Sequence, residues 1–336
     1  MKRDVANPGV LLQTLAPSED AMGLSRRHFT ERLLAAAAAG GAFAPVLAFG
    51  GETPARIDAR RLGTIAKRES QYATTYVDRE GAYLRMRFGV NRCLFTETSY
   101  NPDDPAELPS PYTRAMTVAL AYAGQLKRMV EIGLGGGRLA SYLHDFVPET
   151  KITCVELDPG VVELAQLYFG VKPGPRLELV TADGRVYMAR AKERFDVILI
   201  DAYQGTYVPF HLVTREFFAI LRRKLAPGGV VAQNIAPSVL SLRGMIATAR
   251  AVFDVVDLYR AGNSFVLLAH DGPAKSGAAL KARAEALQAS HKLRYPLALM
   301  LETREAGARS EERPYTDDFA PVGYMDYDRR CRAGTK

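Results

Sequence analysis

The stretch that decides the fold is Val130-Glu131-Ile132-Gly133-Leu134-Gly135-Gly136-Gly137. An apolar, strand-like run ends here, and a glycine-rich turn leads into a helical pattern. Glycines permit a tight turn, and they let backbone N–H groups and the helix N-terminus approach a ligand without interference from Cβ atoms. We therefore predict a nucleotide-binding loop in which Gly133, Gly135, Gly136 and Gly137 lie against the ligand.

The next two predicted strands end in acidic residues. Glu156 ends the second strand, where a carboxylate can accept both hydroxyls of a ribose. Asp183, followed by Gly184, ends the third strand, where it can bind an adenine amine or cap the following helix. A dinucleotide-binding loop would look similar, but the glycine spacing departs from G-x-G-x-x-G and leaves Asp183 unexplained. The three positions together predict an adenosine site.

Apolar runs and helical patterns alternate over most of the chain, which predicts an α/β fold with an open, largely parallel sheet. Short alternating runs between about 56 and 100 predict a small antiparallel β unit before it. The predicted strands of the main sheet are 128–132, 151–156, 177–181, 195–200 and 229–234, with an antiparallel pair at 254–259 and 263–269. The predicted helices are 112–125, 137–146, 159–168, 183–192, 214–225, 240–252 and 276–291.

The composition is ordinary for a globular protein, with 336 residues, of which 48% are hydrophobic and 24% charged. The net charge of +7 is scattered along the chain, so we expect no nucleic-acid partner. No apolar run after the first fifty residues is long enough to span a bilayer. Cys93, Cys154 and Cys331 lack metal-ligand spacing, and we predict no metal site.

The N-terminal segment is typical of a twin-arginine export signal. Residues 25–30 read Ser-Arg-Arg-His-Phe-Thr, and a weakly apolar, Ala-rich stretch extends to Ala48. An Ala-rich amphipathic helix after a disordered start is the alternative, and Met22 offers a second start position. We expect an exported, periplasmic protein if residues 1–48 act as a signal, and a cytoplasmic one otherwise.

Several motifs together resemble the spermidine synthase family of polyamine aminopropyltransferases, particularly its divergent bacterial members. The motifs are Glu69-Ser70-Gln71-Tyr72, the glycine loop, Val155-Glu156-Leu157-Asp158, Asp183-Gly184, Phe195-Asp196-Val197-Ile198-Leu199-Ile200-Asp201 and Thr316-Asp317-Asp318-Phe319-Ala320-Pro321-Val322. The resemblance implies a small antiparallel β domain, residues 49–108, before a Rossmann-like class I methyltransferase-type open sheet. Residues 109–336 would then form a catalytic domain that binds an S-adenosylmethionine-type donor. The resemblance also suggests a homodimer.

The resemblance places a catalytic carboxylate at Asp201, after the fourth strand. A protonated amine has no lone pair with which to attack the carbon beside a sulfonium. A carboxylate near that carbon can therefore accept the proton and orient the nucleophile. Capping of a loop is the alternative role for Asp201.

The glycine loop departs from the family pattern at Arg138. The family usually has an aspartate there, which holds the amine of decarboxylated S-adenosylmethionine. An arginine in the first helical turn opposes the helix dipole by about 0.3–1 kcal/mol, and a facing anion would offset that cost. We therefore weigh two interpretations: Arg138 pairs with the carboxylate of intact S-adenosylmethionine, or it points to solvent.

The acceptor side also departs from the family pattern, because Ala202 onward replaces a motif that carries a second carboxylate. A buried ammonium group without a carboxylate is costly. The residues that we predict to bind the acceptor are Tyr112, Tyr203, Gln204, Tyr207, Asp317 and Asp318, and His211 is a further candidate.

Three functions are open at this point. The first is transfer of an aminopropyl group from decarboxylated S-adenosylmethionine to a small-molecule amine, with release of methylthioadenosine. The second is an enzyme that uses intact S-adenosylmethionine, either as a methyltransferase or to transfer or cyclise the aminocarboxypropyl group. The third is a non-catalytic nucleoside-binding protein. Asp201 and the family resemblance favour the first, whereas Arg138 and the reduced number of acidic residues favour the second.

Overall fold

The computed structural model describes residues 63–90, 93–205, 208–237 and 240–319. These residues all belong to one compact unit, Arg56–Lys336. The export signal predicted at 1–48 and the predicted acceptor residue Tyr207 lie outside the described residues. Within the described ranges, no helix is long and apolar enough to cross a membrane.

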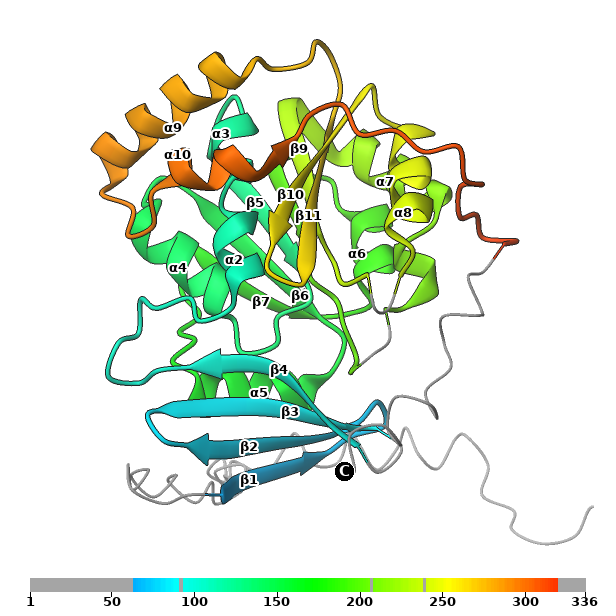
Figure 1. The fold of residues 1–336 in the computed structure, drawn as a ribbon. Coiled ribbons are helices and arrows are strands. Elements are labelled where there is room, and N and C mark those ends of the chain that lie inside the picture. Colours follow the sequence, from blue (N-terminus) through cyan, green and yellow to red (C-terminus); the bar gives the residue numbers. More distant parts are fainter. Residues whose placement is uncertain (1–62, 91–92, 206–207, 238–239, 320–336) are drawn as a thin grey trace, which may run out of the picture. The chain divides into compact units, whose positions relative to one another are not determined.

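A small antiparallel sheet comes first, as predicted. Over the described residues its four strands pair in chain order: β1 (Gly63–Glu69), β2 (Thr74–Glu80), β3 (Tyr83–Val90) and β4 (Cys93–Tyr100). Buried side chains of this sheet, among them Val77, Leu84 and Met86, pack against Val161 and Leu164 of helix α5 (Pro159–Tyr168). Helix α5 contacts strands of both sheets, and Figure 1 shows it behind β3 and β4.

The second sheet has the order β12-β10-β11-β9-β8-β5-β6-β7 in the part of the chain that is described. Its strands are β5 (Arg128–Ile132), β6 (Lys151–Glu156), β7 (Leu177–Thr181), β8 (Phe195–Ile200), β9 (Leu225–Ile235), β10 (Val255–Ala261), β11 (Ser264–His270) and β12 (Arg304–Glu305). Strands β5 to β9 pair in parallel, and β10, β11 and β12 pair antiparallel at the edge. The predicted Rossmann-like class I methyltransferase-type sheet is confirmed.

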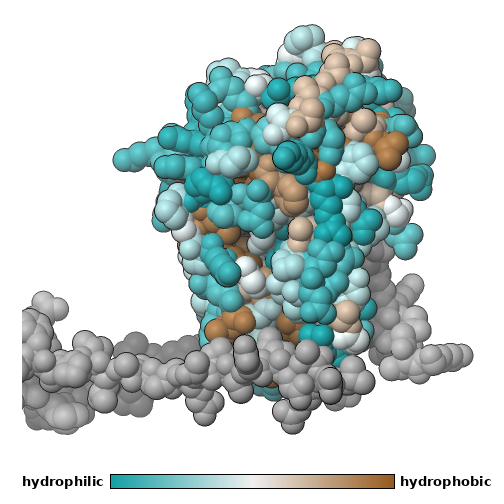
Figure 2. Space-filling view, turned by 90° about the vertical axis from the view of Figure 1, so that its left-hand side faces the viewer, coloured by the Kyte–Doolittle hydropathy of each residue, from teal (hydrophilic) through white to brown (hydrophobic). Residues whose placement is uncertain are grey.

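Helices cover both faces of this sheet (Figure 1). One face packs against α2 (Pro111–Met116), α3 (Ala119–Tyr122), α4 (Arg138–Phe146), α9 (Gly277–His291) and α10 (Leu297–Met300). The other packs against α6 (Gly184–Arg190), α7 (Arg215–Lys224) and α8 (Leu242–Arg250). On the side that carries α9, Figure 2 shows mostly hydrophilic side chains with apolar ones in scattered groups.

The structure differs from the predicted elements in several places: helix α10 was not predicted, and β9 begins at Leu225 rather than at 229. The helix predicted at 112–125 is two short helices, because the backbone bonds change to the i→i−3 pattern around Thr117 and Val118. Strand β12 was not predicted. It is held at the sheet edge by Arg304, whose Nε and Nη2 donate to Asp257 Oδ2 at 3.0 and 2.7 Å. Two 3₁₀ turns, Phe210–Leu212 and Leu301–Thr303, complete the described elements.

Candidate functional site

A cavity of about 300 Å³ opens at the carboxyl ends of the parallel strands. The strand order reverses between β5 and β8, and crevices at such a point are the usual ligand sites of open α/β sheets. Strand β4 of the small sheet closes the cavity from the opposite side, through Thr96, Glu97, Thr98 and Ser99. The site is therefore built from both sheets.

The glycine turn after β5 lies within backbone contact of the turn after β8. Gly133 has φ +91°, and a Cβ placed there would lie 2.4 Å from the backbone oxygen of Asp201. Gly133 and Gly135 line the cavity, and their contact with a ligand stays a prediction. Gly136 and Gly137 are not among the lining residues. A Cβ at these two positions would instead meet Thr98 and Val171, both at 2.5 Å, so these glycines permit close packing rather than ligand approach.

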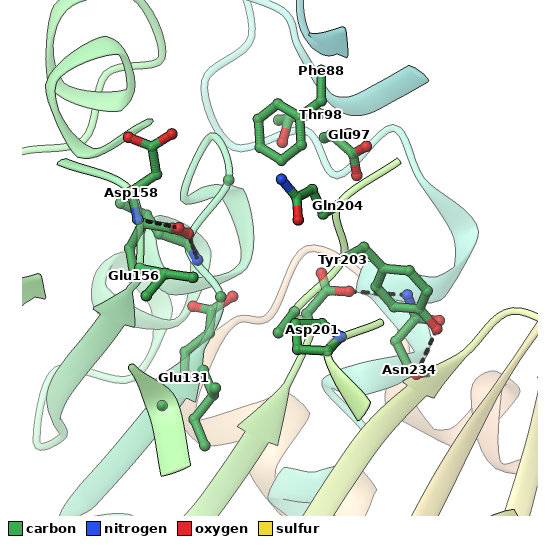
Figure 3. Close-up of a pocket in the computed structure, with 18 of the residues that line it drawn as sticks. Phe88, Glu97, Thr98, Glu131, Glu156, Asp158, Asp201, Tyr203, Gln204 and Asn234 are labelled. Carbon is green, nitrogen blue, oxygen red and sulfur yellow. Dashed lines mark hydrogen bonds between the residues drawn. The ribbon is translucent and has the colours of Figure 1, made fainter. Parts of the chain in front are cut away.

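Glu156 lies at the cavity end of β6, where the ribose ligand was predicted. Its Oε2 accepts from the N–H of Leu134 at 2.9 Å, and its Oε1 accepts from the N–H of Asp158 at 3.0 Å. Figure 3 shows the carboxylate held by these two bonds at the side of the cavity. Burial raises the pKa of Glu156, although the backbone N–H groups oppose the shift. The glycine loop thus fixes the orientation of this carboxylate.

Asp183 and Gly184 both line the cavity, and their contact with adenine stays a prediction. Asp183 also caps α6, because its Oδ1 accepts from the N–H of Val186 at 2.8 Å. Its Oδ2 lies 2.7 Å from Nε2 of His211, which lines the cavity as well. Both alternatives for Asp183 are therefore compatible: it caps the helix and faces the predicted adenine end of the cavity.

Arg138 borders the cavity, but its guanidinium is bonded to the protein. Nη1 donates to the carbonyl of Phe169 at 2.8 Å, and Nη2 donates to the carbonyl of Pro105. The guanidinium carbon lies 4.4 Å from the ring centroid of Tyr100. The side chain is buried, which lowers its pKa. Arg138 therefore does not point to solvent, which was one of the two interpretations weighed from the sequence, and its Nη groups bond to backbone carbonyls.

Asp201 follows β8 and points into the cavity (Figure 3). Its Oδ1 accepts from Nδ2 of Asn234 at 2.9 Å, and the Tyr112 hydroxyl also bonds this carboxylate. Burial raises the pKa of Asp201, and the two hydrogen bonds oppose the shift. An anionic carboxylate with a raised pKa is a better proton acceptor than one in water.

The predicted acceptor residues divide into two groups. Tyr112, Tyr203 and Gln204 line the cavity near Asp201. Asp317 and Asp318 do not line it. Asp317 pairs with Arg185, with Nη–Oδ distances of 2.7 and 2.6 Å, and Asp318 is exposed. The structure therefore does not support an acceptor role for the two tail aspartates, because the nearest guanidinium already neutralises Asp317.

The polar residues of the cavity that were not predicted include Glu97, Glu131 and Asn234. A signal existed for two of them. Glu131 is a charged residue in an otherwise apolar strand, and Asn234 is polar at the end of β9, at the same sheet edge as Asp201. Nothing in the sequence places Glu97 of the small sheet beside these residues.

The cavity is strongly acidic. The carboxylates among its described lining residues are Glu97, Glu131, Glu156, Asp158, Asp183 and Asp201, and Arg138 is the only Arg or Lys among them. Burial raises the pKa of Glu131 well above its usual value, and raises that of Glu97 to about 8. Buried carboxylates without cationic partners are costly, so this cavity is suited to a positively charged ligand. No group of three His, Cys, Asp or Glu residues in the described ranges is arranged to hold a metal ion.

Comparisons with known proteins agree with the resemblance seen in the sequence. Residues 112–259 match a family model described as the spermine/spermidine synthase domain. The chain is 33% identical over 228 residues to the polyamine aminopropyltransferase of Vibrio vulnificus (strain CMCP6), a match that covers 64% of this chain and 75% of that protein. The chain belongs to the spermine/spermidine synthase family.

Solved structures of spermidine synthases share the fold of this family member. One is a spermidine synthase in complex with the transition state analogue AdoDATO, with a TM-score of 0.57, 19% identity, and coverage of 71% of this chain and 84% of that one. Another is a probable spermidine synthase from Corynebacterium glutamicum ATCC 13032, with a TM-score of 0.56, 20% identity, and coverage of 75% and 97%. At these identities, the likeness supports the fold alone.

Proposed function

We propose that this protein transfers the aminopropyl group of decarboxylated S-adenosylmethionine to a small-molecule amine and releases methylthioadenosine. The observation that carries the proposal is the position of Asp201. Its carboxylate lies where the strand order reverses between β5 and β8, in the same cavity as the proposed ribose ligand Glu156. The relatives named polyamine aminopropyltransferase support the reaction class.

The reaction needs a free amine next to an electrophilic carbon. The nitrogen lone pair forms an N–C bond to the carbon beside the sulfonium, and the C–S bond breaks with its electron pair going to sulfur. The leaving group is a neutral thioether, and the amine nitrogen loses one proton. Asp201 would accept that proton and orient the amine, with Asn234 and Tyr112 fixing its carboxylate.

The charge of the cavity supports the decarboxylated donor over the intact one. Intact S-adenosylmethionine would bring a carboxylate into a cavity whose described lining already holds Glu97, Glu131 and Asp201. The residue that favoured the intact donor was Arg138, and its Nη groups bond to backbone carbonyls. A further carboxylate would force these groups to stay protonated, because like charges in a poorly solvated cavity repel each other, so the donor without a carboxylate fits better.

Three further expectations stay predictions. They are the division into a β domain at 49–108 and a catalytic domain at 109–336, export through the signal at 1–48, and a homodimer. The small-molecule amine acceptor belongs to the proposal itself.

The test supplies purified protein with putrescine and either donor, and follows methylthioadenosine and S-adenosylhomocysteine by mass spectrometry. Methylthioadenosine from the decarboxylated donor is the expected product. The variant Asp201→Asn should reduce its formation about 100-fold or more, because general-base catalysis contributes about 10²–10⁴-fold. S-adenosylhomocysteine as the sole product would overturn the proposal in favour of methyl transfer.

A matched control removes a carboxylate far from the cavity. Glu285 is exposed on α9, so Glu285→Gln should keep the wild-type rate. An equal loss of rate in both variants would mean that Asp201 acts through folding or net charge rather than at the reacting atoms.

A further inference from the structure

The C-terminal motif is described over residues 316–319 and does not line the cavity. Its backbone is anchored to helix α7. The N–H of Asp317 donates to Glu216 Oε2 at 3.0 Å, and the carbonyl of Tyr315 accepts from the N–H of Arg215 at 2.8 Å. Figure 1 shows the segment that carries the motif, in red, running beside α7 and α8. These contacts fix the place at which the Asp317 carboxylate stands.

The Asp317 carboxylate binds Arg185, which belongs to the first turn of helix α6. The guanidinium donates from Nη1 to Asp317 Oδ1 at 2.7 Å and from Nη2 to Oδ2 at 2.6 Å, a bidentate arrangement that fixes the direction of both groups. A positive charge in the first turn of a helix is unfavourable unless an anion faces it. Asp317 supplies that anion from a segment far along the chain.

A second carboxylate, that of Asp183, lies near the same guanidinium. Asp183 precedes Arg185 by two residues and caps the helix that carries it. His211 contacts both, because its carbonyl accepts from Arg185 Nη1 at 3.2 Å and its Nε2 lies 2.7 Å from Asp183 Oδ2. The pKa of Arg185 is raised chiefly by its hydrogen bonds to Asp317, and the charge of Asp183 adds to the shift. In the described part of the chain, Arg185 nevertheless forms its ion pair with Asp317 and none with Asp183.

The direction of Arg185 decides what this end of the cavity presents to a purine base. Asp183 faces the predicted adenine end, where a carboxylate accepts from a 6-amino group and repels a 6-oxo group. A guanidinium turned onto Asp183 would neutralise that carboxylate and bring N–H donors, from which a 6-oxo group can accept. Since a site rejects ligands that leave its hydrogen-bonding groups unpaired, selectivity for the base depends on keeping Arg185 away from Asp183.

We propose that Asp317 is a positioning residue for the nucleoside site: it holds Arg185 away from Asp183 and so keeps the Asp183 carboxylate available to a 6-amino purine. The proposal rests on the proposed function for the class of its ligand, and it gives the C-terminal motif a role other than binding the acceptor. Asp317 acts only through Arg185. The side chains of the pair are 23% exposed for Arg185 and 41% for Asp317, so the pair adds little to stability. Its effect is on the choice of ligand.

The test titrates methylthioadenosine and methylthioinosine, which carry a 6-amino and a 6-oxo base, calorimetrically into wild type and variants. The wild type should bind methylthioadenosine about 10- to 100-fold more tightly, because a hydrogen bond to a charged group accounts for a factor of that size. Asp317→Ala frees Arg185 to turn onto Asp183, so the ratio of the two affinities should fall about 10-fold. Adding Arg185→Ala removes the guanidinium as well, and this double variant should return to within about 3-fold of the wild-type ratio.

A matched control breaks another ion pair of similar exposure. Arg222 on α7 donates from Nε to Asp271 Oδ2 at 2.8 Å, and the Asp271 side chain is 40% exposed and does not line the cavity. Asp271→Ala should keep the wild-type ratio of affinities. An unchanged ratio in Asp317→Ala would overturn the proposal. A double variant no more selective than Asp317→Ala would also overturn it, because a merely structural role predicts that removing Arg185 adds to the damage.

The same titrations separate this role of Asp317 from the proposed reaction, because they need no turnover. If the wild type prefers methylthioadenosine, Asp317→Ala loses the preference and the double variant regains it, the role holds even when no aminopropyl transfer occurs, and only the proposed reaction fails. Aminopropyl transfer by a wild type that binds both nucleosides equally would uphold the reaction and overturn the role. A wild type that binds neither nucleoside would overturn both.

Discussion

Asn234 donates a hydrogen bond from Nδ2 to Asp201 Oδ1 at 2.9 Å, across the carboxyl ends of the neighbouring strands β8 and β9. The backbone carbonyl of Asn234 accepts from the Tyr203 hydroxyl at 3.0 Å, so the same residue also holds a wall of the cavity. The side-chain bond fixes one oxygen of Asp201, and the Tyr112 hydroxyl also bonds this carboxylate. Asn234 therefore positions the proposed base.

Asn234→Ala should lower kcat and have little effect on the affinity for the donor. The Asp201 carboxylate loses one of its two hydrogen bonds. The loss of a hydrogen bond to a charged group corresponds to a decrease in rate of about 10- to 100-fold. Steady-state kinetics and donor titration check this, with donor affinity expected to stay within about 3-fold. Gln233→Ala is the control, since Gln233 is buried on the same strand but does not line the cavity. If both variants lose the same fraction of kcat, the effect is one of stability.

Gly133→Ala should destabilise the protein and weaken nucleoside binding. The backbone has φ +91°, and the added Cβ would lie 2.4 Å from the Asp201 oxygen, so both the glycine turn and the Asp201 turn must shift. We expect a loss of about 3 kcal/mol or more from strain and overpacking together. Urea unfolding and methylthioadenosine titration measure the two effects. Gly174→Ala should be nearly neutral, because a Cβ there meets nothing within 4 Å. A stable Gly133→Ala protein with normal affinity would contradict the proposed role of this turn.

The sheet and the positions of Glu156 and Asp201 follow from local sequence. Apolar runs alternating with helices specify parallel strands, and parallel strands deliver the residues that follow them to one edge of the sheet. The predicted bounds of β5 to β8 agree with the structure for this reason. Glu156 and Asp201 could thus be placed in one site without knowledge of tertiary contacts.

The remaining features depend on contacts between distant segments. Glu97 enters the cavity through a bulge in β4 and through the packing of the small sheet on α5, and neither has a signature in one sequence. The direction of Arg138 was also open, because the sequence allowed a guanidinium that faces a donor carboxylate or one that points to solvent, and did not indicate one bonded to the protein. The guanidinium is held by the Tyr100 ring and the Phe169 carbonyl, which belong to segments of the chain other than the helix that carries Arg138.

The unliganded protein should lose stability as pH rises, in part through Glu97. Burial raises the pKa of Glu97 to about 8 in the folded state, against an ordinary value of 4.5. A group with a raised folded pKa stabilises the fold fully below its unfolded pKa, and that contribution is lost as pH rises through the folded pKa. Between pH 6 and 8.5 the loss should be about 2 kcal/mol, after allowance for partial exposure.

Urea unfolding of wild type and Glu97→Gln at the two pH values measures this contribution. The amide does not titrate, so the variant should lose less stability over the same range. Asp201 and Glu131 also have raised pKa values, but they are present in both proteins and cancel in the comparison. Glu107→Gln should follow the wild type. Identical pH dependence in wild type and Glu97→Gln would show that the Glu97 carboxylate is better solvated than its surroundings indicate.

Arg138→Lys should reduce stability and leave the choice of donor unchanged. The guanidinium joins the carbonyls of Phe169 and Pro105 while it stacks on Tyr100, and a lysine ammonium cannot reproduce that planar set of contacts. A loss of about 2 kcal/mol is expected from the broken hydrogen bonds of a buried charge. Urea unfolding measures it, and titration with intact and decarboxylated S-adenosylmethionine measures the ratio of donor affinities. Because both Nη groups bond to backbone carbonyls, the ratio should stay within about 2-fold. A shift of about 10-fold or more toward the decarboxylated donor, without a loss of stability, would instead assign Arg138 to the donor carboxylate.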